Sequence, residues 1–422
     1  MPGHKGTSLT GWEKWDITEI KGADSLYEAD GIISESEKIA GKIFGADTFY
    51  STEGSSQCIR AMIYLVALYA REKGERPLIL ASRNAHKTFL DAVTLCDADV
   101  RWLYGGGEES YLSCKITPER LEKALGSVDK VPTCVYITSP DYLGNMCDIA
   151  ALSKVCEAHG TVLVVDNAHG AYLKHLPVSA HPIDLGAAMC CDSAHKTLPA
   201  LTGGAYLHIS KKAEDVFKLN AKRALSIFGS TSPSYLILQS LDAVNAYTDT
   251  YKAKLGSLLP LAKSIRAELE AHGYAFVGDE SIKFTVDAKK YGYTGTELAG
   301  IMRSRHNIEC EFADPDYIVF MLSPLDKGVK QLRKALLSVP RKSEICDTPP
   351  DFSRGEAVLS VRDAMLSPSE EIPVSASLGR ILSCSNLSCP PAVPILIPGE
   401  RIDKSAISAF NYYGIESVRV VK

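Results

Sequence analysis

Short apolar runs alternate with helical patterns through the first 210 residues of the chain. Several of these runs are apolar at consecutive positions, which is typical of strands buried between two layers of helices. The predicted strands lie at Pro77–Ser82, Val100–Tyr104, Thr133–Thr138, Thr161–Asp166, Ala187–Ser193 and Gly204–Ile209. The helical patterns cover Gln57–Glu72, Pro118–Leu125 and the stretch from Asp148 to Gly160. Strand, helix and strand in repetition predict an α/β fold with a largely parallel sheet.

The pattern changes after Ser240. A long helical stretch is followed by short strands and helices, at Tyr251–His272, Ser281–Val286, Glu297–Arg305, Tyr317–Leu322 and Lys327–Val339. The polar stretch Arg341–Glu356 contains two adjacent prolines and predicts a linker or a surface loop. A last unit, Asp363–Lys422, ends in the predicted strand Ser417–Val421. We therefore expect an N-terminal segment at residues 1–45, a large α/β domain at 46–250 and a smaller α+β region at 251–422, with the linker near 341–356.

Composition and charge exclude several classes of protein. The 422 residues carry 46 Lys and Arg against 51 Asp and Glu, a net charge of −5, so nucleic acid is not the expected partner. The longest apolar run, Ala61–Ala70, is about half of what a membrane-spanning helix needs, and no apolar signal segment follows Met1. The twelve cysteines are irregularly spaced, and Cys190 and Cys191 have no evident further ligand for a metal. We expect a reduced, cytoplasmic protein with no metal site and no membrane partner.

The sharpest local signal is the run Asp-Ser-Ala-His-Lys-Thr-Leu-Pro at residues 192–199, which places Lys196 just after a buried strand. The ordinary alternative is a solvated lysine in a surface loop. At the exit of a buried strand, however, a desolvated lysine amine is a good nucleophile for carbonyl chemistry.

A carboxylate has a matching position about thirty residues upstream. Asp166 follows an apolar strand and so faces the edge at which α/β sheets bind ligands, although an Asp there often only caps a helix. A strand-end Asp together with a strand-end Lys suits pyridoxal phosphate (PLP). The Asp would keep the pyridine nitrogen protonated, and the Lys would form the Schiff base.

Two further signals fit the same cofactor. The run Ser-Thr-Glu-Gly-Ser-Ser at residues 51–56 precedes a predicted helix, whose free N–H groups and positive dipole end attract a phosphate. A simple N-cap would not need this many hydroxyl groups. His86 follows the strand Pro77–Ser82 and could stack on an aromatic cofactor, or could lie on the surface near a helix start. The four features follow one another in the order expected of one cofactor pocket.

On these residues, the chain resembles the ornithine/lysine/arginine decarboxylase family of fold-type-I PLP enzymes, and specifically its shorter members without an N-terminal wing domain. The resemblance covers nearly the whole chain, and it implies a mostly parallel seven-stranded sheet like that of aspartate aminotransferase. Its carriers are Pro2-Gly-His-Lys5, Ser82-Arg-Asn-Ala-His86-Lys, Ser139-Pro-Asp-Tyr-Leu-Gly144, Asp166-Asn-Ala-His169-Gly-Ala, Ser193-Ala-His-Lys196-Thr-Leu-Pro-Ala-Leu-Thr, Ser230-Thr-Ser-Pro-Ser-Tyr235 and Pro390-Pro-Ala-Val-Pro394, which leads to Pro398-Gly-Glu400.

The resemblance implies a role for individual residues. Lys196 would form the Schiff base, Asp166 would pair with the pyridine nitrogen, and His195 would assist proton transfer near the α-carbon. His86 and Ala168 would pack on the two faces of the ring. The implied cofactor-binding set is Gly54, Ser55, Ser56, His86, Asp166, Ala168, His169, Ser193, Lys196, Ser230 and Thr231, and the implied catalytic set is Lys196, His195, Asp166 and His86.

Two more segments carry implications of the resemblance. Ser230 and Thr231 resemble a segment that reaches the phosphate in a neighbouring subunit, which implies a homodimer with shared active sites. His4 and Lys5 resemble an N-terminal motif that lines the substrate entrance.

The implied reaction is the decarboxylation of arginine, lysine or ornithine to CO₂ and an amine that feeds polyamine metabolism. The acid that would choose among these substrates is not evident, and Glu400 and Glu28 are candidates. Two alternatives stay open, because fold-type-I enzymes share this pocket. One is an aminotransferase or another lyase, and the other is a PLP-binding homologue without activity.

The chain departs from the family pattern at several positions. Gly203 stands where a Gln is common, and Asn167 stands where an acid or a Ser is usual. Glu53 would place an acid near the phosphate, which is unfavourable unless its side chain turns away. Cys389 begins what is usually an aromatic-Pro-Pro-Gly pattern. The chain also starts at the Pro-Gly-His-Lys motif, so we expect either a naturally short or a truncated N-terminus.

Overall fold

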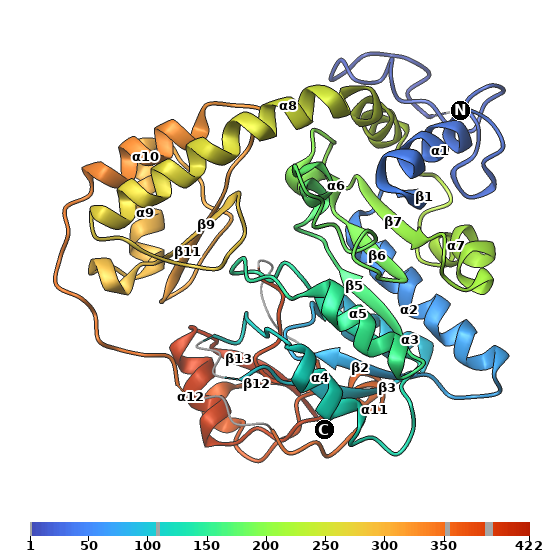
Figure 1. Cartoon of the computed structure of the whole chain (residues 1–422). Helices are drawn as coiled ribbons and strands as arrows, with labels where there is room; N and C mark the ends of the chain where they lie inside the picture. Colours follow the sequence, from blue (N-terminus) through green and yellow to red (C-terminus); the bar gives the residue numbers. More distant parts are fainter. Residues whose placement is uncertain (1, 107–109, 351–354, 385–390) are drawn as a thin grey trace.

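The computed structural model describes residues 2–106, 110–350, 355–384 and 391–422 (Figure 1). Its largest sheet has seven strands in the order β1-β7-β6-β5-β4-β2-β3. Neighbours from β6 to β3 are parallel, whereas β7 is antiparallel to both β1 and β6. The strands are β1 (Ala46–Ser51), β2 (Leu78–Ser82), β3 (Asp99–Leu103), β4 (Cys134–Thr138), β5 (Val162–Asp166), β6 (Met189–Asp192) and β7 (Ala205–Ser210). The predicted α/β fold with a mostly parallel seven-stranded sheet is confirmed.

Helices cover both faces of this sheet because both faces of its central strands are apolar. Tyr136 and Val164 point into a core with α2, α3 and α7, and their neighbours Val135 and Leu163 point into a second core with α4 and α5. The first seven α-helices are α1 (Ile32–Phe44), α2 (Gly54–Glu72), α3 (Lys87–Cys96), α4 (Pro118–Leu125), α5 (Ile149–Ala158), α6 (Ala194–Thr197) and α7 (Asp215–Ile227).

The six strands predicted in the first 210 residues correspond to β2 through β7. The sequence pattern missed β1, which lies at the edge of the sheet and alternates buried with partly exposed residues over only part of its length. Such a short, half-buried segment has too weak a pattern to stand out between two helices.

The long helix α8 (Tyr235–Ala271) begins well before the predicted start at Tyr251. It leads from the large sheet to the next part of the chain (Figure 1). The domain boundary that we predicted between residues 250 and 251 therefore falls inside a continuous helix. The division into domains stays a prediction.

Two small sheets follow α8. The first has four antiparallel strands in the order β10-β11-β9-β8, and the second pairs β12 with β13. Their strands are β8 (Ala275–Val277), β9 (Lys283–Asp287), β10 (Phe312–Ala313), β11 (Tyr317–Met321), β12 (Ser369–Pro373) and β13 (Ser417–Val421). The helices in this region are α9 (Gly295–His306), α10 (Gly328–Ser338), α11 (Val361–Leu366) and α12 (Lys404–Tyr412).

The final unit returns to the large sheet (Figure 1). The guanidinium of Arg83, just after β2, donates to the carbonyls of Pro394 and Ile395 at 2.8 and 2.7 Å. These bonds bring a segment from the end of the chain to the carboxyl edge of the sheet. Cys389 and Pro390, which belong to one of the motifs above, lie outside the described residues. Within the part of the chain that is described, no helix combines the length and the apolar character that a membrane span needs.

Candidate active site

A cavity of about 310 Å³ opens at the carboxyl ends of β2, β4, β5 and β6. This is the edge at which open α/β sheets bind ligands. Ten of the residues predicted from the sequence line it: Gly54, Ser55, Ser56, His86, Asp166, Ala168, His169, Ser193, His195 and Lys196. The fold thus brings together side chains from separate stretches of sequence.

Lys196 lies on the short helix α6, directly after β6. Its Nζ is 2.9 Å from Nε2 of His169, and His169 in turn meets the ring of Tyr142 edge-on with ring centroids 5.1 Å apart. Burial, reinforced by the charge of Lys196, holds the pKa of His169 well below its usual range. His169 is therefore neutral, and its Nε2 can accept a hydrogen bond from the lysine.

Asp166 is the last residue of β5 and is almost completely buried. Its carboxylate accepts hydrogen bonds from the Tyr136 hydroxyl and from the backbone N–H of Ala168, each at 3.2 Å. Burial raises the pKa of this carboxyl despite these donors. A buried carboxylate of this kind is stabilised by a cation placed next to it, and a protonated ring nitrogen in the cavity would supply one.

The N-terminus of α2 forms another part of the cavity wall, with Gly54, Ser55 and Ser56 in its first turn. The Ser193 hydroxyl donates to that of Ser55 at 2.8 Å, so two hydroxyl groups gather at the free N–H groups of the helix. This arrangement is suited to a phosphate.

Glu53 precedes this turn but points away from it. Its carboxylate accepts the backbone N–H of Ser230, and Glu53 is exposed. The Glu53 side chain therefore turns away from the proposed phosphate position, so its negative charge does not face a phosphate bound there.

His86 caps the N-terminus of α3, where its Nδ1 accepts the backbone N–H of Thr88 at 3.1 Å. Burial, together with the nearby Lys196, lowers the pKa of His86 to about 3, so its ring is neutral and suited to flat packing. His195 binds the Gly204 carbonyl through Nδ1 at 3.0 Å, and burial lowers its pKa as well.

Four predicted residues are not among the described residues that line this cavity. Ser230 and Thr231 are exposed just before α8. His4 is held in the N-terminal segment by Asp16, 3.2 Å from its Nε2, and Lys5 follows it. The chain does not bring these four to its own cavity.

The sequence prediction missed several residues of the cavity wall: Ile59, Arg60, Asn84, Lys87, Thr88, Asp91, Thr138, Pro140, Tyr142, Pro391 and Val393. Some signals for them existed, because Asn84, Lys87, Pro140, Tyr142, Pro391 and Val393 stand inside motifs that carry the family resemblance. Arg60 on α2 and Asp91 on α3 form an ion pair, with Nη2 and Oδ2 3.6 Å apart. No motif marks these two residues.

The backbone conformation explains why a glycine stands at position 203. Its φ is +96°, and a Cβ on it would lie 2.7 Å from the carbonyl oxygen of Thr52. The Gly203 carbonyl also accepts the backbone N–H of Gly54, the first residue of α2, at 2.7 Å. A larger residue would therefore disturb the turn that leads into α2.

The residues around the cavity fit PLP. A lysine, a buried carboxylate, a neutral histidine ring and an anion-binding helix end face one space. The hydroxyl of Thr138, in the same wall, is buried and has no hydrogen-bond partner among the described residues. Fold and site together define a fold-type-I enzyme.

Comparisons with known proteins agree with this class. Residues 12–283 match the family model described as Orn/Lys/Arg decarboxylase, major domain. An arginine decarboxylase of Halalkalibacterium halodurans is 30% identical over 93% of this chain and 83% of its own length. The chain therefore belongs to the Orn/Lys/Arg decarboxylase family, whose members are PLP-dependent carboxy-lyases.

Solved structures show the same fold. The lysine decarboxylase LdcF of Francisella novicida superposes with a TM-score of 0.79 at 16% identity, covering 100% of this chain and 78% of that one. A structure of SPT with PLP has a TM-score of 0.55 at 13% identity, over 72% of this chain and 75% of that one.

Proposed function

We propose that this protein is a PLP-dependent decarboxylase of a basic amino acid and that Lys196 holds the cofactor covalently. The observation that carries the proposal is that Lys196, Asp166 and the N-terminus of α2 line one cavity. When bound, PLP supplies an electron sink for the carbanion that forms when CO₂ leaves.

The side chains of the cavity divide the work of binding. Asp166 keeps a proton on the ring nitrogen, and its own burial strengthens that attraction. Ser55, Ser56 and Ser193 hold the phosphate at the helix end, while His86 and Ala168 pack against the ring. His86 can do this at physiological pH because its ring is neutral.

Proton transfer falls to groups around the Lys196 amine. Lys196 is the first candidate to return a proton to the α-carbon, and the neutral His169 can orient its amine by accepting a hydrogen bond from Nζ. His195 lines the same wall and is the second candidate to return a proton to the α-carbon. A positioned acid of this kind typically contributes about 10²–10⁴-fold to rate.

The substrate class rests on relatives named arginine decarboxylase and lysine decarboxylase. Among the described residues, the acids in the cavity wall are Asp166, which serves the ring, and Asp91, which is paired with Arg60. Glu28 and Glu400 are not in the described wall, and Glu400 is buried with its carboxylate on the Ile397 N–H. Arginine, lysine and ornithine all carry the distal cation that this class requires, and each would give a polyamine precursor.

A homodimer with shared active sites is part of the proposal. The exposed Ser230 and Thr231 would complete the phosphate site of the partner, and His4 and Lys5 would line its entrance. Supporting this, an apolar groove continues from the cavity wall across the surface, lined by Arg60, Asp91, Thr94, Leu95, Phe228, Met365 and Leu366. Such exposed apolar surface is typical of subunit contacts. We further propose a cytoplasmic location, which suits the described cysteines, because none of them is in a disulfide and most are buried.

The attachment of the cofactor can be tested directly. Borohydride reduction of the PLP-loaded protein, followed by peptide mass mapping, should place the pyridoxyl group on Lys196. Lys196→Ala should lose both the label and CO₂ release, whereas Lys154→Ala, on the exposed face of α5, should keep both. A label on another lysine, or CO₂ release by Lys196→Ala at the wild-type rate, would refute the assignment.

A further inference from the structure

A chain of buried hydrogen bonds crosses neighbouring strands behind the cavity. Its centre is Asp192, the last residue of β6, which is completely buried. One carboxylate oxygen accepts the side-chain amide of Asn167 at 2.6 Å. The other accepts the Nε2–H groups of His181 and His208, at 3.1 and 3.2 Å. His208 continues the chain to the Thr48 hydroxyl on β1, 2.9 Å from its Nδ1.

This network joins the two strand ends that carry the proposed chemistry. Asn167 directly follows Asp166, and Asp192 stands four positions before Lys196. The 2.6 Å hydrogen bond between the Asn167 and Asp192 side chains therefore links the segment just after Asp166 to the strand end that precedes Lys196. All of its partners are excluded from water, where hydrogen bonds to a charge are strong and a missing donor is costly.

The Asp192 carboxylate is ionised in this setting. Burial alone would raise its pKa, but the two histidines and their hydrogen bonds hold the pKa below the ordinary range. An acid at position 167 would place a second carboxylate against it in the same buried space. Asn167 supplies the same shape with a donor instead of a charge, which explains why the chain departs from the family pattern here.

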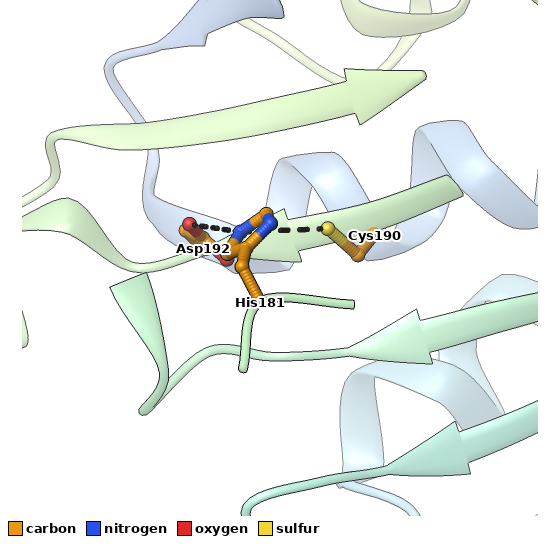
Figure 2. A group of neighbouring side chains, drawn as sticks. All are labelled: His181, Cys190 and Asp192. Carbon is orange, nitrogen blue, oxygen red and sulfur yellow. Dashed lines mark hydrogen bonds and ion pairs between the residues drawn. The ribbon is translucent and has the colours of Figure 1, made fainter. Parts of the chain in front are cut away.

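A metal ion is the competing explanation. His181, Cys190 and Asp192 offer ligand atoms within 4.8 Å of one another, with the His181 ring between the other two groups (Figure 2). However, three donors already engage the Asp192 oxygens. Nδ1 of His181 is also buried without a partner among the described residues, whereas a metal-bound histidine normally donates that second N–H to an acceptor. The hydrogen-bonded arrangement accounts for the cluster without an ion.

We propose that Asp192 and Asn167 are matched positioning residues, which together fix the strand ends bearing Asp166 and Lys196. The proposal rests on the proposed PLP site, because it concerns the placement of its two central groups. Neither residue lines the described cavity, so they act through their neighbours and not on the substrate.

An exchange of the two side chains tests this proposal. The variants are Asn167→Asp, Asp192→Asn and the double exchange, with Asn411→Asp on the exposed face of α12 as the matched control. We expect Asn167→Asp to lower the unfolding midpoint of the cofactor-free protein. We also expect it to lower kcat per bound cofactor by about 10- to 100-fold, with little change in KM, because misplaced reacting groups slow the chemical step.

The double exchange should recover most of both losses. The carboxylate introduced at position 167 would then accept the amide introduced at position 192, while the histidines keep an acceptor in the amide oxygen. The defect of Asn167→Asp should also shrink as the pH falls, because one of its two facing carboxylates then takes up a proton and can donate. If Asn167→Asp cannot be purified but the double variant can, the exchange has restored folding, which also supports the proposal.

Three outcomes would overturn the proposal. If the double variant recovers neither the unfolding midpoint nor kcat relative to Asn167→Asp, the two side chains are not matched. If kcat per bound cofactor is unchanged in Asn167→Asp, the pair has only a structural role. One equivalent of zinc in the purified protein, lost in Asp192→Asn, would assign the cluster to a metal. Failure of the wild-type protein to bind PLP is a different result, because it refutes the proposed function itself.

Discussion

Lys196 and Asp166 owe their places to the residues just before them. Each follows an apolar run that becomes a buried strand, so sequence alone puts both at the carboxyl edge of the sheet. Residues such as Arg60 and Asp91, which no motif marks, reach the same cavity only through the packing of α2 and α3 in the folded chain. A local pattern cannot reveal such contacts, and for that reason part of the cavity wall was missed.

The Asp166 carboxylate gives a prediction at this scale. Asp166→Asn keeps the shape of the side chain, but its single amide oxygen can accept only one of the two hydrogen bonds from Tyr136 and Ala168. The substitution also removes the charge that we propose holds a proton on the ring nitrogen. We expect kcat to fall by about 100-fold or more while the cofactor remains bound through Lys196 and the serines. Steady-state kinetics with cofactor occupancy from absorbance measures this. Asp249→Asn, at an exposed site on α8, should be neutral, and wild-type kinetics in Asp166→Asn would contradict its role.

At the scale of elements, prediction succeeded where the local chemistry is explicit. The helix α4 begins and ends where predicted. Its start is explicit in the sequence, because Thr117 caps it by accepting the Arg120 N–H and Pro118 is its first residue. The start of α8 was missed because the Ser- and Pro-rich stretch before Tyr235 obscures it.

The same helix continues through Pro260, a residue that usually ends or kinks a helix. Leu258 before the proline and Ala262 after it are both buried in one large core. Tertiary packing therefore overrides the local signal there, which a reading of local pattern alone cannot anticipate.

The turn at Gly203 supplies the prediction for elements. Gly203→Ala must adopt a φ that only glycine takes easily and must also approach the Thr52 carbonyl. We expect a loss of about 1–3 kcal/mol in unfolding free energy and weaker PLP binding, because the turn anchors the first residue of α2. Urea unfolding and a PLP titration measure both quantities.

Gly256→Ala is the matched control. Gly256 lies on α8 with open space around its Cα, so alanine there should stabilise the helix by about 0.5–1 kcal/mol. Equal effects of the two substitutions would show that Gly203 has no special role.

At the scale of the whole molecule, the site draws on distant parts of the chain. The large sheet provides the strand ends, and the segment around Pro391 and Val393 closes the cavity from near the C-terminus. The α/β class followed from strand and helix repetition, and the number of strands from the family resemblance. The return of the C-terminal unit to this edge could not be predicted, because it depends on contacts such as those of Arg83 with the Pro394 and Ile395 carbonyls.

The proposed homodimer with shared active sites predicts complementation between inactive subunits. Lys196→Ala should be inactive, and Ser230→Ala/Thr231→Ala should bind the partner's phosphate poorly. A hybrid dimer would contain one intact site, with Lys196 from one subunit and both hydroxyls from the other. Activity should therefore appear when the two variants are mixed under conditions that allow subunit exchange. Mixtures that stay inactive although hybrids form would contradict sharing.

Buried neutral histidines predict acid sensitivity. Burial, with nearby Lys252, lowers the pKa of His175 to about 4, so as pH falls below about 6.5 the unfolded chain takes up a proton that the folded chain refuses. Stability is therefore lost from about pH 6.5 towards pH 4, and His175→Gln should reduce this loss by up to about 3 kcal/mol. Urea unfolding at several pH values measures the slope. His272→Gln, at an exposed site, should leave it unchanged, and an equal slope in His175→Gln would refute the assignment.

The most direct test of the account is CO₂ release by the PLP-loaded wild-type protein, with arginine, lysine and ornithine offered separately and products identified by mass. We predict CO₂ and the corresponding amine from at least one of the three, and neither from Lys196→Ala. No CO₂ from any of them by a protein that carries PLP on Lys196, or conversion to a keto acid instead of an amine, would contradict the assignment as a decarboxylase of basic amino acids.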